Sequence, residues 1–157
     1  MLVLATTIMP SVLILAAVIF SDRFREPLKP ILSTFFVGVF LCFPAGFLNS
    51  ILIWNQDAPE YYTFLAGVTE ESLKFTAILL FVRNLTEFDE PMDAIVYGTL
   101  ISLGFATLEN LEYVYNSHSA AESMQIATIR AITAVPLHAC CGVIMGYFFG
   151  IYAFSGQ

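Results

Sequence analysis

Long apolar stretches alternate with short polar breaks along this chain. A lipid-spanning helix needs about 20 mostly apolar residues, and five stretches approach that length: residues 2–20, 31–54, 61–82, 92 to about 115, and 131 to the C-terminus. The first, second and fifth stretches carry no charged residue, whereas the third and fourth carry several. The pattern therefore predicts an all-α fold, a polytopic membrane helical bundle of about five transmembrane helices.

The breaks are too short to hold a second domain, so residues 1–157 are expected to form one transmembrane domain. Before the last stretch the chain reads SAAE from Ser119 to Glu122, a Ser and a Glu at the spacing of a capping box. A helix that starts there is too long for one straight crossing. We therefore expect Ser119 to Arg130 to lie partly at the membrane interface.

The composition agrees with a membrane protein, since 58% of the residues are apolar and only 12% are charged. Both values exclude an ordinary cytosolic domain. A net charge of −7 also argues against a nucleic-acid partner, because phosphate binding requires clustered Lys and Arg. The lipid bilayer is the expected environment.

Basic residues predict the orientation of the chain in the membrane. Arg23, Arg25 and Lys29 lie in the first break and Arg83 lies in the third. Cytoplasmic loops are enriched in Lys and Arg, so these two breaks are predicted to be cytoplasmic and the N-terminus to lie outside. The first stretch lacks the basic start and the small-residue cleavage site of a signal peptide, so we interpret it as a retained span.

Small residues in the apolar stretches indicate close helix packing. Glycines recur every four residues at positions 142, 146 and 150, a spacing that lets a second helix approach along one face. Pro136 cannot donate to the carbonyl of Ile132, which predicts a kink close to His138. Cysteines 42, 140 and 141 are interpreted as small core residues, not as disulfide or metal partners.

Five ionisable residues lie well inside the predicted spans, away from the helix ends, where each costs about 2.5 to 3.5 kcal/mol on the translocon scale and is a functional hypothesis by default. They are Glu70, Glu71, Lys74, Glu109 and His138. At about 1.5 Å per residue, the three helices that carry them bring these side chains to roughly the same depth, about 9 to 14 Å from one face of the membrane. By contrast, His118 is expected in solvent, and Asp93 and Glu112 near helix ends.

This group of residues suits hydrolysis. Lys74 is three or four residues from Glu71 and Glu70, so it can pair with either carboxylate, and helical geometry alone does not rank them. Two nearby buried carboxylates repel each other when both are charged, so one of them tends to keep a proton. Such a pair provides an acid and a base and can activate water. The imidazole of His138 can stabilise an oxyanion or move a proton. Cleavage of a peptide bond in or beside the membrane is the reaction that these groups favour.

Two other interpretations stay open. The residues can form a buried ion cluster that only fixes helix packing. Alternatively, the protein binds a cation or relays protons as a membrane transport or binding protein without peptidase activity.

Four motifs resemble, in order and spacing, the PrsW family of intramembrane proteases, which is related to the CAAX prenyl proteases and the bacterial Abi proteins. The motifs are EESLK (70–74), DEPMDAIVYG (89–98), FATLENLEY (105–113) and PLHACCGVIMGYFFG (136–150). The resemblance covers about residues 60–150. It implies a glutamic-type peptidase domain in a bacterial or archaeal cell membrane, with an anti-sigma-factor-like transmembrane protein as substrate.

The resemblance also implies roles for individual residues. Glu70 would be the water-activating base, with Glu71 beside it held by Lys74, Glu109 the second ligand of the water and His138 the oxyanion stabiliser. Related CAAX enzymes carry an Asn four residues after this His, where the present chain has Gly142. Asn110 is the candidate for the missing donor, and Arg130, on the same helical row as His138, for a supporting role.

No cofactor is expected under this mechanism. The alternative is zinc, because Glu70 or Glu71, Glu109 and His138 would make three ligands with an open position, as in catalytic zinc sites.

Overall fold

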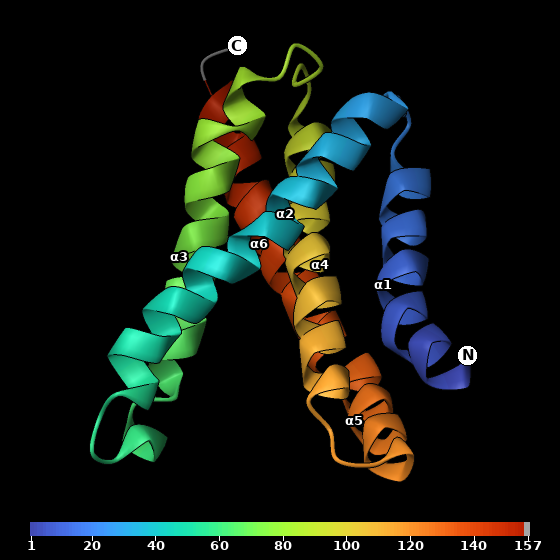
Figure 1. Cartoon of the computed structure of the whole chain (residues 1–157). Coiled ribbons are helices and arrows are strands. Elements are labelled where there is room, and N and C mark those ends of the chain that lie inside the picture. Colours follow the sequence, from blue (N-terminus) through green and yellow to red (C-terminus); the bar gives the residue numbers. More distant parts are fainter. Residues whose placement is uncertain (156–157) are drawn as a thin grey trace.

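Helix α4 (Pro91–Tyr115) is the central element of the computed structural model, which describes residues 1–155. It contacts each of the other five α-helices, and Figure 1 shows α2 crossing in front of it and α6 behind it. In its most apolar 18-residue window 72% of α4 is buried, against 11% of α1. The helix begins with Pro91 and a capping box in which Glu90 and Asp93 bind each other's backbone N–H groups.

The remaining elements surround α4. Along the chain they are α1 (Leu2–Ser21), α2 (Leu28–Asn49), the π-helical turn η1 (Ser50–Trp54), the 3-10 turn η2 (Pro59–Tyr61), α3 (Phe64–Leu80), the 3-10 turn η3 (Val82–Asn84), α5 (Ala120–Ile132) and α6 (Ala134–Phe154). Figure 1 shows α1 and α3 on opposite sides of the bundle. Within residues 1–155 there is no strand, and the predicted all-α polytopic bundle is confirmed.

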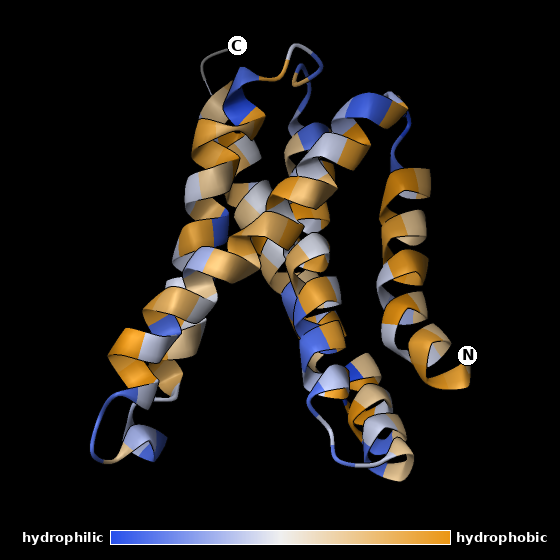
Figure 2. Ribbon diagram, viewed as in Figure 1, coloured by the Kyte–Doolittle hydropathy of each residue, from blue (hydrophilic) through white to orange (hydrophobic). Residues whose placement is uncertain are grey.

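Four stretches are long and apolar enough to cross a membrane: Leu2–Ser21, Leu28–Trp54, Pro91–Tyr115 and Ala120–Phe154. The predicted third span corresponds to α3, which is 17 residues long and carries Glu70, Glu71 and Lys74. It is therefore shorter and more polar than the others. Figure 2 shows hydrophobic residues along most of the helices and hydrophilic residues mainly at the connecting loops, on α3 and on one half of α4. The chain is an integral membrane protein.

The last stretch is divided into two helices. As expected from SAAE, Ser119 caps α5 and accepts a hydrogen bond from the backbone N–H of Glu122 at 3.2 Å. Helix α5 ends at Ile132 and α6 begins at Ala134, so the chain breaks at Thr133. The break lies directly after Ile132. Pro136 has no backbone N–H and therefore does not donate to the carbonyl of Ile132. The predicted interruption is present, about one turn before His138.

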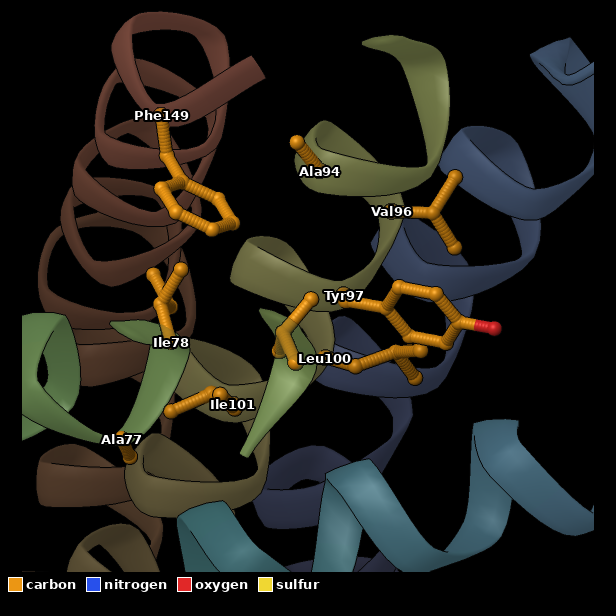
Figure 3. Close-up of a cluster of buried hydrophobic side chains, with 9 residues drawn as sticks. Ala77, Ile78, Ala94, Val96, Tyr97, Leu100, Ile101 and Phe149 are labelled. Carbon is orange, nitrogen blue, oxygen red and sulfur yellow. The ribbon is translucent and has the colours of Figure 1, made fainter. Parts of the chain in front are cut away.

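The apolar core lies where α3, α4 and α6 meet. Figure 3 shows Tyr97, Leu100 and Ile101 of α4 packed with Ile78 of α3 and Phe149 of α6, all at most 2% exposed. Because this core is tied to α4, the position of α4 determines where its neighbours carry their polar residues.

Glycines let α4 and α6 approach closely, as their spacing predicts. A Cβ on Gly98 would lie 2.7 Å from the carbonyl oxygen of Gly142, and a Cβ on Gly142 would lie 2.7 Å from that of Gly98. A Cβ on Gly146 would meet the backbone of Ala94. The two backbones are thus in contact, which only glycine permits at these positions.

One part of the cysteine interpretation is wrong. Cys42 is buried and donates to the carbonyl oxygen of Phe105 at 3.3 Å, and Cys141 is half-buried. Cys140 is exposed, because it lies on the side of α6 that faces away from the bundle. All three cysteines are free.

We expect Gly146→Ala to lower the thermal stability of the detergent-solubilised protein by an amount equivalent to about 1–3 kcal/mol, because the new methyl group collides with the α4 backbone. The matched control is Gly67→Ala in α3, where a Cβ has nothing within 4 Å. Equal melting temperatures for the two variants would show that this contact does not hold the helices together.

Candidate active site

Three helices bring their polar side chains together inside the bundle. Glu70, Glu71 and Lys74 come from α3, Glu109 from α4 and His138 from α6. One potential ligand atom each from Glu70, Glu109 and His138 lies within 4.8 Å of the others. These groups come together because α4 and α6 touch at Gly142, one turn after His138, so the imidazole is held against the α4 side chains. The convergence that their depth predicts is present.

Lys74 links α3 to α6. Its side chain is fully buried, and its Nζ lies 2.7 Å from Oε1 of Glu71 and 2.8 Å from Nδ1 of His138. The same ammonium group lies 4.2 Å from the centroid of the Phe105 ring, on α4. A buried ammonium needs such partners, since burial without them costs several kcal/mol. Lys74 therefore holds both Glu71 and His138 in place.

Glu109 is held by the last two helices. Its Oε2 accepts from Nη2 of Arg130 at 2.5 Å and lies 3.1 Å from Nε2 of His138. The Nε of Arg130 donates to Oδ1 of Asn110, and its guanidinium stacks 4.1 Å from the centroid of the Tyr113 ring. Arg130 therefore contacts both Glu109 and Asn110, and its supporting role stays a prediction.

Glu70 has a different environment from the other two carboxylates. Its Oε1 accepts a hydrogen bond from Nδ2 of Asn49 at 3.1 Å, and Oδ1 of Asn49 accepts from Thr69. Among residues 1–155 no Lys, Arg or His forms an ion pair with Glu70. Glu71 and Glu109 each have a cation and Glu70 has none, a distinction that helical spacing alone does not provide.

A cavity of about 610 Å³ opens beside these groups. Glu70 and Glu109 line it together with polar and aromatic side chains from α2, η1 and α4. The lining extends to Thr63 before α3 and to Ser117 and Glu122 at the α4–α5 turn, near the end of the bundle where these connections lie (Figure 1). The two carboxylates are therefore reachable from one face of the membrane.

Two residues differ from the sequence interpretation. Asn110, the candidate for a missing oxyanion donor, is 2% exposed and does not line the cavity, because its Oδ1 is bound to Arg130. It supports Arg130 instead. Asn49 was missed, although it is an amide at the end of an otherwise apolar stretch, and it orients Glu70 and lines the cavity. Its polarity within residues 31–54 is the signal that indicates it.

Known proteins resemble this chain over most of its length. A protein-family model described as "PrsW family intramembrane metalloprotease" matches residues 26–157. Protease PrsW of Bacillus subtilis (strain 168) is 36% identical over 159 residues, covering 99% of this chain and 71% of the relative. Protease PrsW of Geobacillus kaustophilus (strain HTA426) is 39% identical over 150 residues, covering 93% and 64%. Protease PrsW of Clostridioides difficile (strain 630) is 32% identical over 143 residues, covering 87% and 60%. No solved structure matches the chain.

We expect Lys74→Met to destabilise the protein, because it leaves Glu71 beside His138 without its cation. The loss should be smaller than the ~3–5 kcal/mol of a fully buried pair, since the Glu71 side chain remains 30% exposed. The double variant Lys74→Met with Glu71→Gln should recover part of this loss. Lys29→Met, at an exposed lysine of α2, is the control. The measurement is thermal unfolding in detergent of the unchanged protein and the three variants. A Lys74→Met melting temperature equal to that of Lys29→Met would contradict the assigned ion pair.

Proposed function

Because the chain belongs to the PrsW family of intramembrane proteases, we propose that its cavity is a peptidase site in which Glu70, Glu109 and His138 hydrolyse a peptide bond of a membrane protein. The observation that carries the proposal is that two carboxylates from different helices line one cavity, with an imidazole hydrogen-bonded to one of them. The bundle acts in this proposal as a single peptidase domain.

Glu70 is the water-activating base in this mechanism. Lys74 engages Glu71, and Arg130 engages Glu109. Glu70 has only the neutral Asn49 amide as partner at Oε1, and no residue within 1–155 donates to its Oε2. A carboxylate without a paired cation is the one that is free to accept a proton.

The reaction then proceeds by general base and general acid steps. A water molecule between Glu70 and Glu109 transfers a proton to Glu70 as its oxygen forms a bond to the scissile carbonyl carbon. The tetrahedral intermediate collapses, the C–N bond breaks, and the leaving nitrogen takes the proton from Glu70. Proton transfers of this kind contribute about 100-fold to 10,000-fold to the rate.

His138 and Lys74 stabilise the developing charge. Lys74 is paired with Glu71 and therefore donates to Nδ1 of His138, which places the proton of the neutral imidazole on Nε2. That nitrogen lies 3.1 Å from Oε2 of Glu109, a residue that lines the cavity. From there it is placed to donate to an oxyanion that forms next to Glu109, as an oxyanion hole requires.

The walls of the cavity support a proposal for the substrate class. Apolar and aromatic side chains, among them Ile53, Trp54 and Phe105, suit an apolar peptide segment. Polar groups at the α4–α5 turn suit a segment that leaves the membrane. We therefore propose a transmembrane protein cleaved near the surface of the membrane, of the anti-sigma-factor type that the family resemblance implies.

The proposed orientation places the cavity outside the cytoplasm. Arg23, Arg25 and Lys29 lie at the α1–α2 connection, at the opposite end of the bundle from the α4–α5 turn (Figure 1). Thr6, near the N-terminus, contacts Met124 of α5 and so lies at the cavity end. If the basic connection is cytoplasmic, the N-terminus and the cavity are extracytoplasmic.

The description of the family as metalloproteases raises the question of a bound metal. Glu70, Glu109 and His138 would hold it, and their spacing within 4.8 Å suits three ligands with an open position. A bound zinc ion would supply Lewis-acid polarisation of a water or a carbonyl. The hydrogen bonds do not suit coordination, because the Lys74 ammonium at Nδ1 places a proton on Nε2, the imidazole nitrogen nearest to Glu109. We therefore propose that the residues of the chain activate water without a metal.

The first test is proteolysis of a single-span substrate protein in proteoliposomes. We expect Glu70→Gln and Glu109→Gln each to lower the cleavage rate by about 100-fold or more, since each removes a carboxylate from the water site. Glu87→Gln, in the loop between η3 and α4, is the matched control and should cleave normally. Intact cleavage by both active-site variants would refute the peptidase site.

The second test separates the two chemistries. In the same assay, with millimolar Mg²⁺ present, we expect phenanthroline to leave the cleavage rate unchanged and elemental analysis to find no zinc in the purified protein. Loss of activity that zinc restores, together with a zinc content that His138→Ala abolishes, would establish the metal-dependent form.

A further inference from the structure

A second group of acidic residues lies at the other end of α4. It consists of Asp22, which follows α1, Glu26 in the α1–α2 loop, and Asp93 in the first turn of α4. One carboxylate oxygen from each lies within 4.8 Å of the others. Asp22 is 5% exposed and Asp93 is fully buried. Three carboxylates so close together, with two of them out of solvent, repel each other.

Each aspartate has one oxygen bound and one oxygen without a partner. Oδ2 of Asp93 accepts the backbone N–H groups of Asp89 and Glu90 at 2.9 and 2.8 Å, and Oδ1 of Asp22 accepts that of Phe24 at 3.0 Å. Oδ1 of Asp93 and Oδ2 of Asp22 are buried and have no hydrogen-bond partner. Buried polar atoms are nearly always satisfied, so two such oxygens in one cluster are available to bind a ligand.

Glu26 completes the group from the loop. The hydroxyl of Tyr97 donates to its Oε2 at 2.5 Å. Figure 3 shows the Tyr97 ring in the apolar core with its hydroxyl directed outward from that core. Burial and the neighbouring carboxylates of Asp93 and Asp22 raise the pKa of Glu26 to about 7. Burial and the like charges of its neighbours thus disfavour the ionised form of Glu26 unless a cation binds beside it.

The basic residues nearby do not neutralise the group. Arg23 and Arg25 lie in the same loop, yet their guanidinium groups stack 5.4 and 4.7 Å from the ring centroids of Phe24 and Phe20. Within residues 1–155, neither these arginines nor any other cation forms an ion pair with Asp22, Glu26 or Asp93. A proton on Glu26 or a cation from solution is left to balance the charge of the group.

We propose that Asp22, Glu26 and Asp93 bind one hard divalent cation, Mg²⁺ or Ca²⁺, at the α1–α2 end of the bundle. Three carboxylates are all-oxygen donors with high charge, the ligand set that these two ions prefer, whereas zinc prefers nitrogen and sulfur. The two unpartnered oxygens supply ligands that the fold has already oriented through their backbone hydrogen bonds.

The site is separate from the candidate active site. Glu109 lies about 16 residues further along α4 than Asp93, or roughly 24 Å. A cation here would join the α1–α2 loop to the first turn of α4, and through Tyr97 to the apolar core. It would therefore fix α1, which is the least buried of the four long apolar stretches, to the centre of the bundle.

The experiment measures thermal unfolding of the purified full chain in a zwitterionic detergent, with increasing MgCl₂ or CaCl₂ and with NaCl at matched ionic strength. We expect a saturable rise of several degrees with one or both divalent salts and none with NaCl, because a ligand that binds only the folded state stabilises it. An equal response to NaCl and to both divalent salts would overturn the proposal, since the acidic group would then be screened without binding an ion.

Amide variants locate the site while keeping the hydrogen bonds. Asp22→Asn, Asp93→Asn and Glu26→Gln each retain an acceptor oxygen, and each should abolish the divalent-specific rise. Two control variants should keep the divalent-specific rise. Asp89→Asn removes an exposed carboxylate from the same region, and Glu109→Gln removes a carboxylate from the candidate active site. If Asp93→Asn does not fold, Glu26→Gln in the loop decides the outcome. A divalent rise that survives Glu26→Gln, or that Glu109→Gln abolishes, would place the ion elsewhere and refute the site.

Discussion

The structure depends on one constraint, which is that charged groups buried in a membrane protein must find partners within the protein. Lys74 has no exposed surface. It pairs with Glu71 on its own helix, and its contact with His138 joins α3 to α6. Arg130 and Glu109 make the matching connection between α5 and α4. Because the Lys74–His138 and Arg130–Glu109 contacts each join two helices, the interactions that satisfy the charges also help to determine the shape of the cavity. A buried cation without its carboxylate would cost several kcal/mol, more than the contact of a typical apolar side chain contributes.

Backbone contact between helices makes those polar connections possible. At Gly98 and Gly142 the α4 and α6 backbones touch, which brings His138 within hydrogen-bond distance of Glu109. A larger residue at either glycine would separate the helices by more than the tolerance of a hydrogen bond. The apolar core and the polar site are therefore two results of the same helix crossing.

The sequence predicts much of this arrangement and omits the rest for physical reasons. Hydropathy predicted the helices, and the depth of Glu70, Glu109 and His138 along them predicted that these residues meet. Residue spacing does not encode which cation pairs with which carboxylate, so the proposed choice of Glu70 over Glu71 as the base rests on the Lys74–Glu71 ion pair. Hydropathy does not tell which face of a helix is turned toward the bundle. The contact of the Asn49 amide with Glu70 and the exposure of the Cys140 thiol depend on that orientation.

The short helix α3 has a consequence for how the protein is made. With 17 residues and three charged side chains, it is a poor candidate for release into lipid on its own, because each charge costs about 2.5 to 3.5 kcal/mol during insertion. His138, which Lys74 contacts, is synthesised later, on α6. The ribosome must therefore complete most of the chain before Lys74 has this native partner. We therefore expect α3 to stay beside the translocon, or at the membrane surface, until the C-terminal helices emerge.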